Sequence, residues 1–258
     1  MQIISLDLLD LFWAWGIILL VIAISRWQKF GLEGQFLLAS FRALCQLMLI
    51  GYVLEFIFTL NQPIAVIAIM LIMITIAAIT ARNRIGKKIA GLLSIVWGTL
   101  FISTTFVVSY SIILIIQPDQ WYNPQYLIPL VGMILGNTLN GASLSGERLA
   151  SMIKNNRLEI ETHLSLGATP KEAIFTYRQE AIRVGLIPIL NSMMIVGMVS
   201  LPGMFTGQVL AGNNPLDAAF YQILILFMIA FANVVTVWLI SEGVYRSFFN
   251  SQQQLIIK

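Results

Sequence analysis

Four methionines lie close together in one hydrophobic stretch of the sequence: Met193, Met194, Met198 and Met204. Met194 and Met198 are four residues apart, so in a helix they share one face. Thioether sulfur is a soft ligand that suits copper(I) and, less well, other transition ions. The alternative is that these side chains only fill gaps between packed helices, a common role of methionine. The stretch is therefore a candidate path for a metal substrate.

The same stretch runs into Pro202-Gly203, a dipeptide typical of a helix end because proline has no backbone N–H. In a membrane, carbonyl groups freed by a broken helix are tolerated only where protein or water satisfies them. We therefore expect Pro202, Met204 and Gln208, together with Met194 and Met198, to line a polar path for the substrate.

Polar side chains in two other hydrophobic stretches are further candidates for this path. Asn137 and Asn140 stand beside the G-x-x-x-G pair Gly132 and Gly136. Small residues let membrane helices approach closely, and buried amides hydrogen-bond between helices, so packing, within the chain or in a dimer, is one interpretation. Lining of a polar cavity is the other. Glu55, at the outer end of its helix, would give the mouth of a path a negative potential, unless it is simply an exposed acid.

The sequence offers little for catalysis. Residues 141–146 (Gly-Ala-Ser-Leu-Ser-Gly) have the glycine spacing of a phosphate-binding loop, but Glu147-Arg148 replaces the Lys-Ser/Thr that would contact phosphate and magnesium. We interpret them as the end of a membrane helix, where small residues permit tight packing. With one His163, one Cys45 and no paired carboxylates, the sequence predicts no enzyme, no catalytic residue and no cofactor of its own, and it leaves the metal ligands unknown.

Residues 146–183 form the only long polar segment, which we call the elbow. Charged and apolar positions alternate at helical spacing over 157–166. Gly167 follows where a helix needs a left-handed C-terminal residue. Thr169 and Glu172 form a T-x-x-E capping box around Pro170, which suits the first position of a helix. Two helices joined by a short turn are therefore expected.

The outer surface of the elbow is expected to carry apolar side chains from Ile160, Leu164, Leu166 and Ala168, beside the charged Glu159, Glu161 and Lys171. Apolar groups on a rigid exposed turn are typical of an interface, so the elbow is a candidate docking surface for a cytoplasmic partner. The alternative is a solvated connector.

The composition sets the class of protein. The 258 residues are 58% hydrophobic and 10% charged, whereas soluble domains carry about 25% charged residues. Seven stretches approach or exceed the ~20 residues that a ~30 Å hydrocarbon core requires, at 8–27, 36–59, 63–80, 89–116, 125–144, 181–205 and 218–240. We therefore predict one all-α transmembrane domain over residues 1–258, with about seven spans and the elbow between spans five and six.

The basic residues predict the orientation. In a seven-span arrangement all fifteen Lys and Arg fall on one side, with most of them in the 82–88 connection and the elbow. The opposite loops carry acids such as Asp7, Asp119 and Asp217 instead. By the positive-inside rule, the elbow and the C-terminus are cytoplasmic and the N-terminus is outside, in a cell (inner) membrane. No basic stripe with interleaved aromatics indicates nucleic-acid binding.

Residues 161–167 (Glu-Thr-His-Leu-Ser-Leu-Gly) have the E-x5-G spacing of the EAA loop found in ABC-transporter permeases. Gly132-Met-Ile-Leu-Gly-Asn137, Leu166-Gly-Ala-Thr169 and the 200–212 stretch that contains Leu-Pro-Gly-Met resemble signatures of the FetB/YbbM permease family. Arg42-Ala-Leu-Cys-Gln-Leu47 fits its second helix. The resemblance covers most of the chain.

The resemblance implies a homodimeric permease that pairs with two separate cytoplasmic ATPase subunits. The family includes a bacterial iron export permease and plant proteins linked to aluminium tolerance. The implied cargo is a metal ion or metal-linked solute. The coupling contacts would come from Glu161, His163, Leu164, Leu166, Gly167, Ala168, Thr169 and Glu172. Two rival interpretations are a secondary metal-ion transporter and a membrane scaffold that recruits a cytoplasmic partner without transport.

Overall fold

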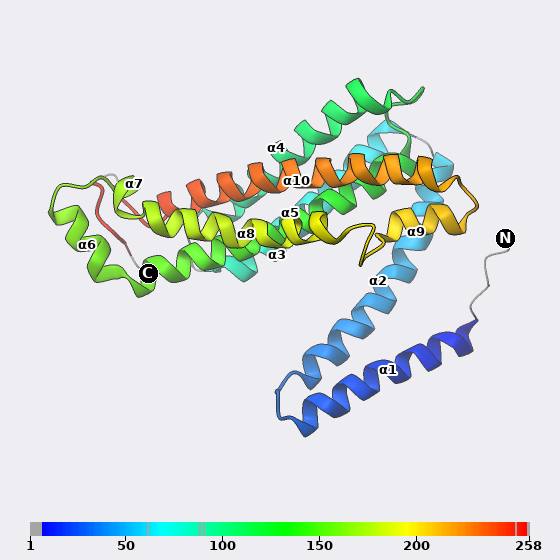
Figure 1. Ribbon diagram of the computed structural model, residues 1–258, viewed down its shortest axis with the longest axis horizontal. Coiled ribbons are helices and arrows are strands. Elements are labelled where there is room, and N and C mark those ends of the chain that lie inside the picture. The colour runs from blue at the N-terminus through cyan, green and yellow to red at the C-terminus, as the bar shows by residue number, and fades with distance from the viewer. Residues whose placement is uncertain (1–6, 61, 88, 90, 251, 257–258) are drawn as a thin grey trace. The chain divides into compact units, whose positions relative to one another are not determined.

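The structure, a computed structural model, describes residues 7–60, 62–87, 89, 91–250 and 252–256, and these form helices joined by short turns (Figure 1). The helices are α1 (Leu8–Trp27), α2 (Glu33–Leu60), α3 (Pro63–Ile85), α4 (Leu92–Tyr110), the π-helix η1 (Ser111–Ile116), α5 (Pro124–Asn155), α6 (Arg157–Ser165), α7 (Pro170–Ala173), α8 (Phe175–Ile195), α9 (Gly203–Leu210) and α10 (Pro215–Arg246). The predicted all-α class is confirmed.

Six described segments are long and apolar enough to cross a membrane: all of α2, α3, α5 and α10, most of α1, and α4 continued by η1. The sixth predicted span, 181–205, is not one continuous helix. Helix α8 ends at Ile195, because Gly197 takes the left-handed backbone conformation (φ +81°) that stops a helix, and the chain turns before α9 begins at Gly203. The break was expected at Pro202-Gly203, so it begins earlier than predicted.

The described chain divides into two compact units. The first comprises Met1–Gln62 with Leu210–Gly212, and its helices α1 and α2 form a hairpin. Gly31 (φ +71°) lies in the turn of this hairpin, and Ser25 Oγ donates a hydrogen bond of 3.2 Å to Glu33 across it. The second unit comprises Pro63–Val209 and Asn213–Lys258. It contains the elbow and almost all of the candidate path residues. The prediction of a single domain over 1–258 stays a prediction.

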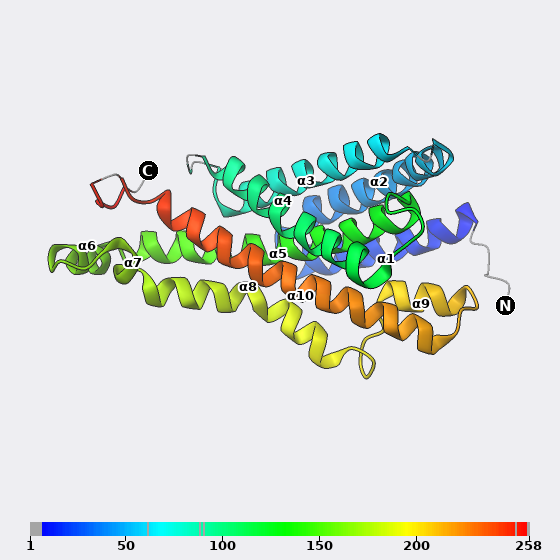
Figure 2. The same cartoon turned by 90° about the horizontal axis from the view of Figure 1, so that it is seen from above.

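Helix α5 is the centre of the second unit and packs against α3, α4, α8 and α10. Figures 1 and 2 show α3, α5 and α10 running toward the end that carries α6 and α7, and α8 running away from it. Ile134, Leu149 and Ile153 of α5 are fully buried in this core.

Basic residues gather at the elbow end of the second unit. Arg82 and Arg84 lie in the last turn of α3, Arg246 lies in the last turn of α10, and Arg178 lies near the start of α8. Lys88 and Lys258 are outside the described residues. Within the second unit these residues share one end, as the sequence predicted, while the side of the membrane on which that end lies stays a prediction.

Helices α5, α8 and α10 pack tightly at two glycines. A Cβ added to Gly185 would lie 2.8 Å from Ser145 Cβ and 2.9 Å from the Gly141 carbonyl oxygen. A Cβ on Gly141 would in turn meet the Asn233 side chain of α10. Residues 141–146 are therefore helical packing residues, as predicted, and not a phosphate loop. In the predicted pair, a Cβ on Gly132 would lie 3.3 Å from Met73 Cε, whereas Gly136 faces open space in this single chain.

Gly185→Ala is expected to lower the free energy of unfolding in detergent by about 1–3 kcal/mol, because the added methyl would meet backbone that cannot move aside. Gly98→Ala is the matched control, since a Cβ at this helical position meets nothing within 4 Å. Equal stability of the two variants by thermal or SDS-induced unfolding would contradict the close contact.

Candidate coupling elbow and cavity

The elbow has the local structure that its sequence predicts. Helix α6 ends at Ser165, and Gly167 adopts φ +92°. The Glu172 carboxylate accepts hydrogen bonds of 2.8 Å from the backbone N–H and from the hydroxyl of Thr169, and the Glu172 N–H donates to Thr169 Oγ1 at 3.4 Å. Pro170 occupies the first position of α7. The turn between α6 and α7 is therefore held by a complete capping box.

The exposure of the apolar side chains differs from the expectation. Leu158 and Leu166 are each 81% exposed, whereas Ile160 is fully buried. Each residue turns a helix by about 100°, so Leu158 and Ile160 lie on opposite sides of α6. Ile160 therefore belongs to the inner side of the elbow and was wrongly placed on its surface. Leu164 and Ala168 are half-buried.

Charged side chains lie close to the exposed leucines in the sequence of the elbow. Arg157 Nε donates to Glu161 Oε1 at 2.7 Å, and His163 Nε2 lies 4.0 Å from Glu159 Oε1. All four side chains are at least 38% exposed, so they shape the surface potential of the elbow and contribute little to stability. The exposed part of the elbow thus carries two apolar side chains together with side chains of both charges.

An open groove of about 680 Å³ lies between the elbow and the C-terminal segment. Glu161, Leu164, Gly167 and Ala168 line one side, and residues 252–255 line the other. Four of the predicted coupling residues therefore share one surface with a segment that the sequence had not connected to them.

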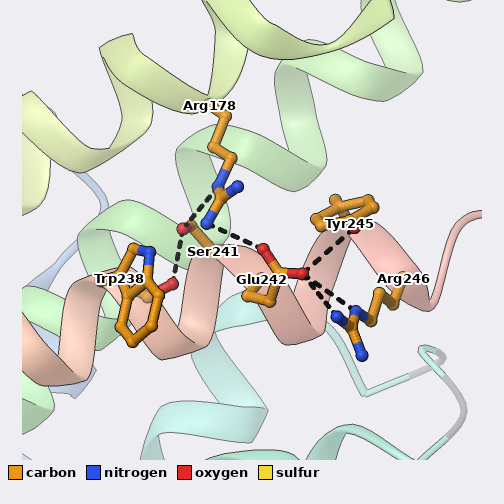
Figure 3. Close-up of polar contacts among 6 residues, drawn as sticks. All are labelled: Arg178, Trp238, Ser241, Glu242, Tyr245 and Arg246. Atoms are coloured by element: carbon orange, nitrogen blue, oxygen red, sulfur yellow. Dashed lines mark hydrogen bonds and ion pairs between the residues drawn. The ribbon is translucent and has the colours of Figure 1, made fainter. Parts of the chain in front are cut away.

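A polar network ties the elbow end of α8 to α10 (Figure 3). Arg178 Nη2 lies 2.9 Å from Glu242 Oε2, and Arg178 Nε donates to Ser241 Oγ at 3.1 Å. Tyr245 and Arg246 donate to Glu242 Oε1 at 3.1 and 2.8 Å. The Arg178 and Glu242 side chains are only 13% and 19% exposed. This network was not predicted from the sequence, although Glu242 inside an apolar helix was a signal for it, because an unpaired charge there is costly.

A cavity of about 280 Å³ lies at the break between α8 and α9. Its lining comes from α5, the α8–α9 region and α10, and comprises Met133, Asn137, Ile189, Ser192, Val196, Ser200, Pro202, Gly203, Met204, Gln222, Ile225, Leu226 and Ile229. Three of the predicted path residues, Asn137, Pro202 and Met204, are brought together here. Ser192, Ser200 and Gln222 were not predicted, and Gln222 sits in a hydrophobic helix where an amide is unusual.

The other predicted path residues lie elsewhere. Met194 and Met198 are 65% and 82% exposed and do not line the cavity. Asn140 Oδ1 accepts a hydrogen bond of 3.3 Å from Arg84, and Gln208 is not among the lining residues. Glu55 belongs to the first unit. Nowhere in the described ranges do three or more His, Cys, Asp or Glu side chains gather into one group.

Several helices of membrane-spanning length, with a capped helical turn at one end, define a multi-pass α-helical membrane protein. The chain belongs to the uncharacterised protein family UPF0014, which matches residues 8–249. This confirms the resemblance drawn from its motifs.

Three relatives illustrate the family. The chain is 52% identical to UPF0014 membrane protein slr1647 of Synechocystis sp., over 99% of this chain and 98% of that protein. It is 34% identical to the probable iron export permease protein FetB of Escherichia coli, over 93% and 92%. It is also 34% identical to protein ALUMINUM SENSITIVE 3 of Arabidopsis thaliana, over 93% and 86%. No solved structure matches the chain.

The capping box predicts a lowered pKa for the Glu172 carboxyl group. The Thr169 backbone N–H, and then its hydroxyl, hold the pKa of Glu172 below its usual value. Because the folded-state pKa is lowered, the cap stabilises the elbow at neutral pH, and this contribution is lost as the pH falls through the lowered pKa. Thr169→Val is expected to raise the pKa of Glu172 toward its ordinary value, measured by the carbon-13 shift of the carboxyl group. Thr162→Val, whose hydroxyl bonds only within α6, should leave it unchanged.

The network between α8 and α10 predicts a loss of stability. Glu242→Gln is expected to lower the free energy of unfolding by about 2–3 kcal/mol, because the poorly exposed Arg178 charge loses its counter-ion. Arg157→Gln breaks the exposed pair in α6 and should change it by less than about 0.5 kcal/mol. Indistinguishable unfolding midpoints for the two variants would show that the network does not hold α8 to α10.

Proposed function

We propose that this chain is the transmembrane permease subunit of an ABC transporter, which moves a metal ion or metal-linked solute with energy from a separate ATP-binding subunit. The observation that carries the proposal is the elbow: a capped helical turn with Leu158 and Leu166 each 81% exposed at the basic end of the second unit. Two exposed leucines on a rigid turn, with charged residues nearby in the sequence, are more stable when buried in a groove of a partner than when exposed to water.

The relatives support the cargo class. One of them, similar over almost its whole length, is named a probable iron export permease protein. The lining of the cavity agrees with passage of a small polar or cationic solute, because it gathers amide, hydroxyl and thioether groups at a helix break. Iron leaving the cytoplasm is therefore the cargo and direction that we propose.

The orientation and assembly complete the proposal. The basic residues at the elbow end face the cytoplasm by the positive-inside rule, in the cell (inner) membrane, with the N-terminus outside. Two copies of the chain each present one elbow to one of two ATP-binding subunits. In this proposal ATP is bound by the separate subunit, in agreement with the helical packing of residues 141–146.

Helix α8 connects the elbow to the cavity. Its first turn follows α7 directly, and its last turns contribute Ile189 and Ser192 to the cavity. Arg178 and Gly185 hold it against its neighbours along the way. Closure of the ATP-binding subunits would push on the elbows, move α8 as a rigid element, and change the opening of the cavity between the two sides of the membrane.

Gly167→Val tests the coupling. Valine at φ +92° is strained, so the turn between α6 and α7 must rearrange, although no neighbouring atom is displaced. We expect loss of ATP-dependent uptake of radioactive iron(II) into inside-out vesicles, and loss of co-purification of the ATP-binding subunit. Gly31→Val introduces the same strain (φ +71°) into the α1–α2 turn and should leave co-purification intact.

The same vesicles separate the rival functions. Iron uptake that needs a proton gradient and no ATP would establish a secondary transporter. Co-purification of a cytoplasmic protein without any uptake would establish a scaffold. Either outcome would overturn the proposed function.

A further inference from the structure

The cavity at the helix break contains a polar group that the protein leaves unsatisfied. Gln222 of α10 is 8% exposed and lines the cavity. Its Oε1 atom is buried and accepts no hydrogen bond from any described residue. A buried acceptor without a partner is costly inside a membrane. This atom therefore favours a ligand that supplies a hydrogen-bond donor or a positive charge.

Two of the neighbouring polar side chains each donate one hydrogen bond within the protein. Asn137 Nδ2 donates to the Met133 carbonyl oxygen at 2.8 Å, and Ser192 Oγ donates to the Pro188 carbonyl oxygen at 2.9 Å. The oxygen atoms of both side chains therefore remain as acceptors. With Gln222 Oε1, three oxygen acceptors border one cavity.

The remaining lining residues limit the kind of ligand that the cavity can bind. Met133 and Met204 contribute thioethers, and none of the lining residues is ionisable. Helix α8 ends beside the cavity, and the C-terminal end of a helix carries a partial negative charge. The competing feature is the start of the short helix α9 at Gly203, whose free N–H groups would suit an anion.

We propose that this cavity binds a partly dehydrated transition-metal cation, with Gln222 Oε1 as its anchoring ligand, Asn137 Oδ1 beside it, and the methionine thioethers as soft ligands. A volume of about 280 Å³ holds an ion with several waters, each of which takes about 30 Å³. Neutral ligands bind such an ion weakly, which suits a transit site. Magnesium is disfavoured, because it prefers carboxylates and sheds water reluctantly.

This inference rests on the proposed function in one respect: the ion bound in the cavity is taken to be the transported cargo. Binding is measured on the full chain in detergent, without ATP and without an ATP-binding subunit. Failure of the binding test therefore leaves the coupling of the elbow untouched, and failure of the coupling test leaves the binding site untouched.

Cobalt(II) is the probe, because it is an air-stable transition ion, and magnesium and phosphate are the comparisons. Equilibrium dialysis should find one saturable cobalt site per chain, with binding of magnesium at least about tenfold weaker. Gln222→Leu keeps the side-chain volume similar and removes the acceptor, so cobalt binding should weaken about tenfold or more. Gln208→Leu, outside the cavity, should not change it.

Two further variants distinguish loss of the binding site from loss of the fold. Gln222→Glu places a carboxylate at the same position and should tighten cobalt binding, the opposite of what a damaged fold would do. Met204→Leu should reduce the preference for cobalt over magnesium, whereas Met198→Leu, on a side chain that is 82% exposed, should not. Undiminished cobalt binding by Gln222→Leu, weaker binding by Gln222→Glu, or saturable binding of phosphate in place of cobalt would each overturn the proposal.

Discussion

The second unit depends on the close approach of α5, α8 and α10 at Gly141 and Gly185. Only hydrogen atoms fit where Gly185 meets Ser145 and the Gly141 carbonyl group, so α5 and α8 approach to backbone contact, and side chains of α10 pack against both glycines. That contact fixes α8 along its length, since Arg178 holds one end to Glu242 and the cavity lies near the other. Both candidate sites therefore lie along one helix that its neighbours hold in place.

The elbow was predictable because its signals are local. Gly167, Thr169 and Glu172 each act on backbone atoms within a few residues, so their spacing in the sequence determines their hydrogen bonds. The inward position of Ile160 was not predictable in this way. It depends on which side of α6 meets the bundle, and a helix with apolar residues on both sides does not reveal this.

The cavity was predicted only in part, because it is assembled from residues far apart in the chain. The sequence indicated a helix break and placed Asn137, Pro202 and Met204 among the path residues, and the structure brings those three together. It also indicated Met194 and Met198 from their spacing, but Met198 lies beyond the end of α8, and both side chains are exposed outside the cavity. Predicting Gln222 and the Arg178–Glu242 pair would have required knowing which helices are neighbours. The periodicity of the sequence does not give this information.

The lengths of α5 and α10 have a consequence for the surroundings of the protein. Each helix has 32 residues and is about 48 Å long, whereas a bilayer with its headgroups is about 40–45 Å thick. The two helices are therefore longer than the bilayer is thick, so the end of α5 that leads into the elbow can extend beyond the lipid phosphates. In a thicker, sterol-rich bilayer the same helices would not extend beyond the headgroups. Anionic headgroups would then compete for the basic residues around the elbow.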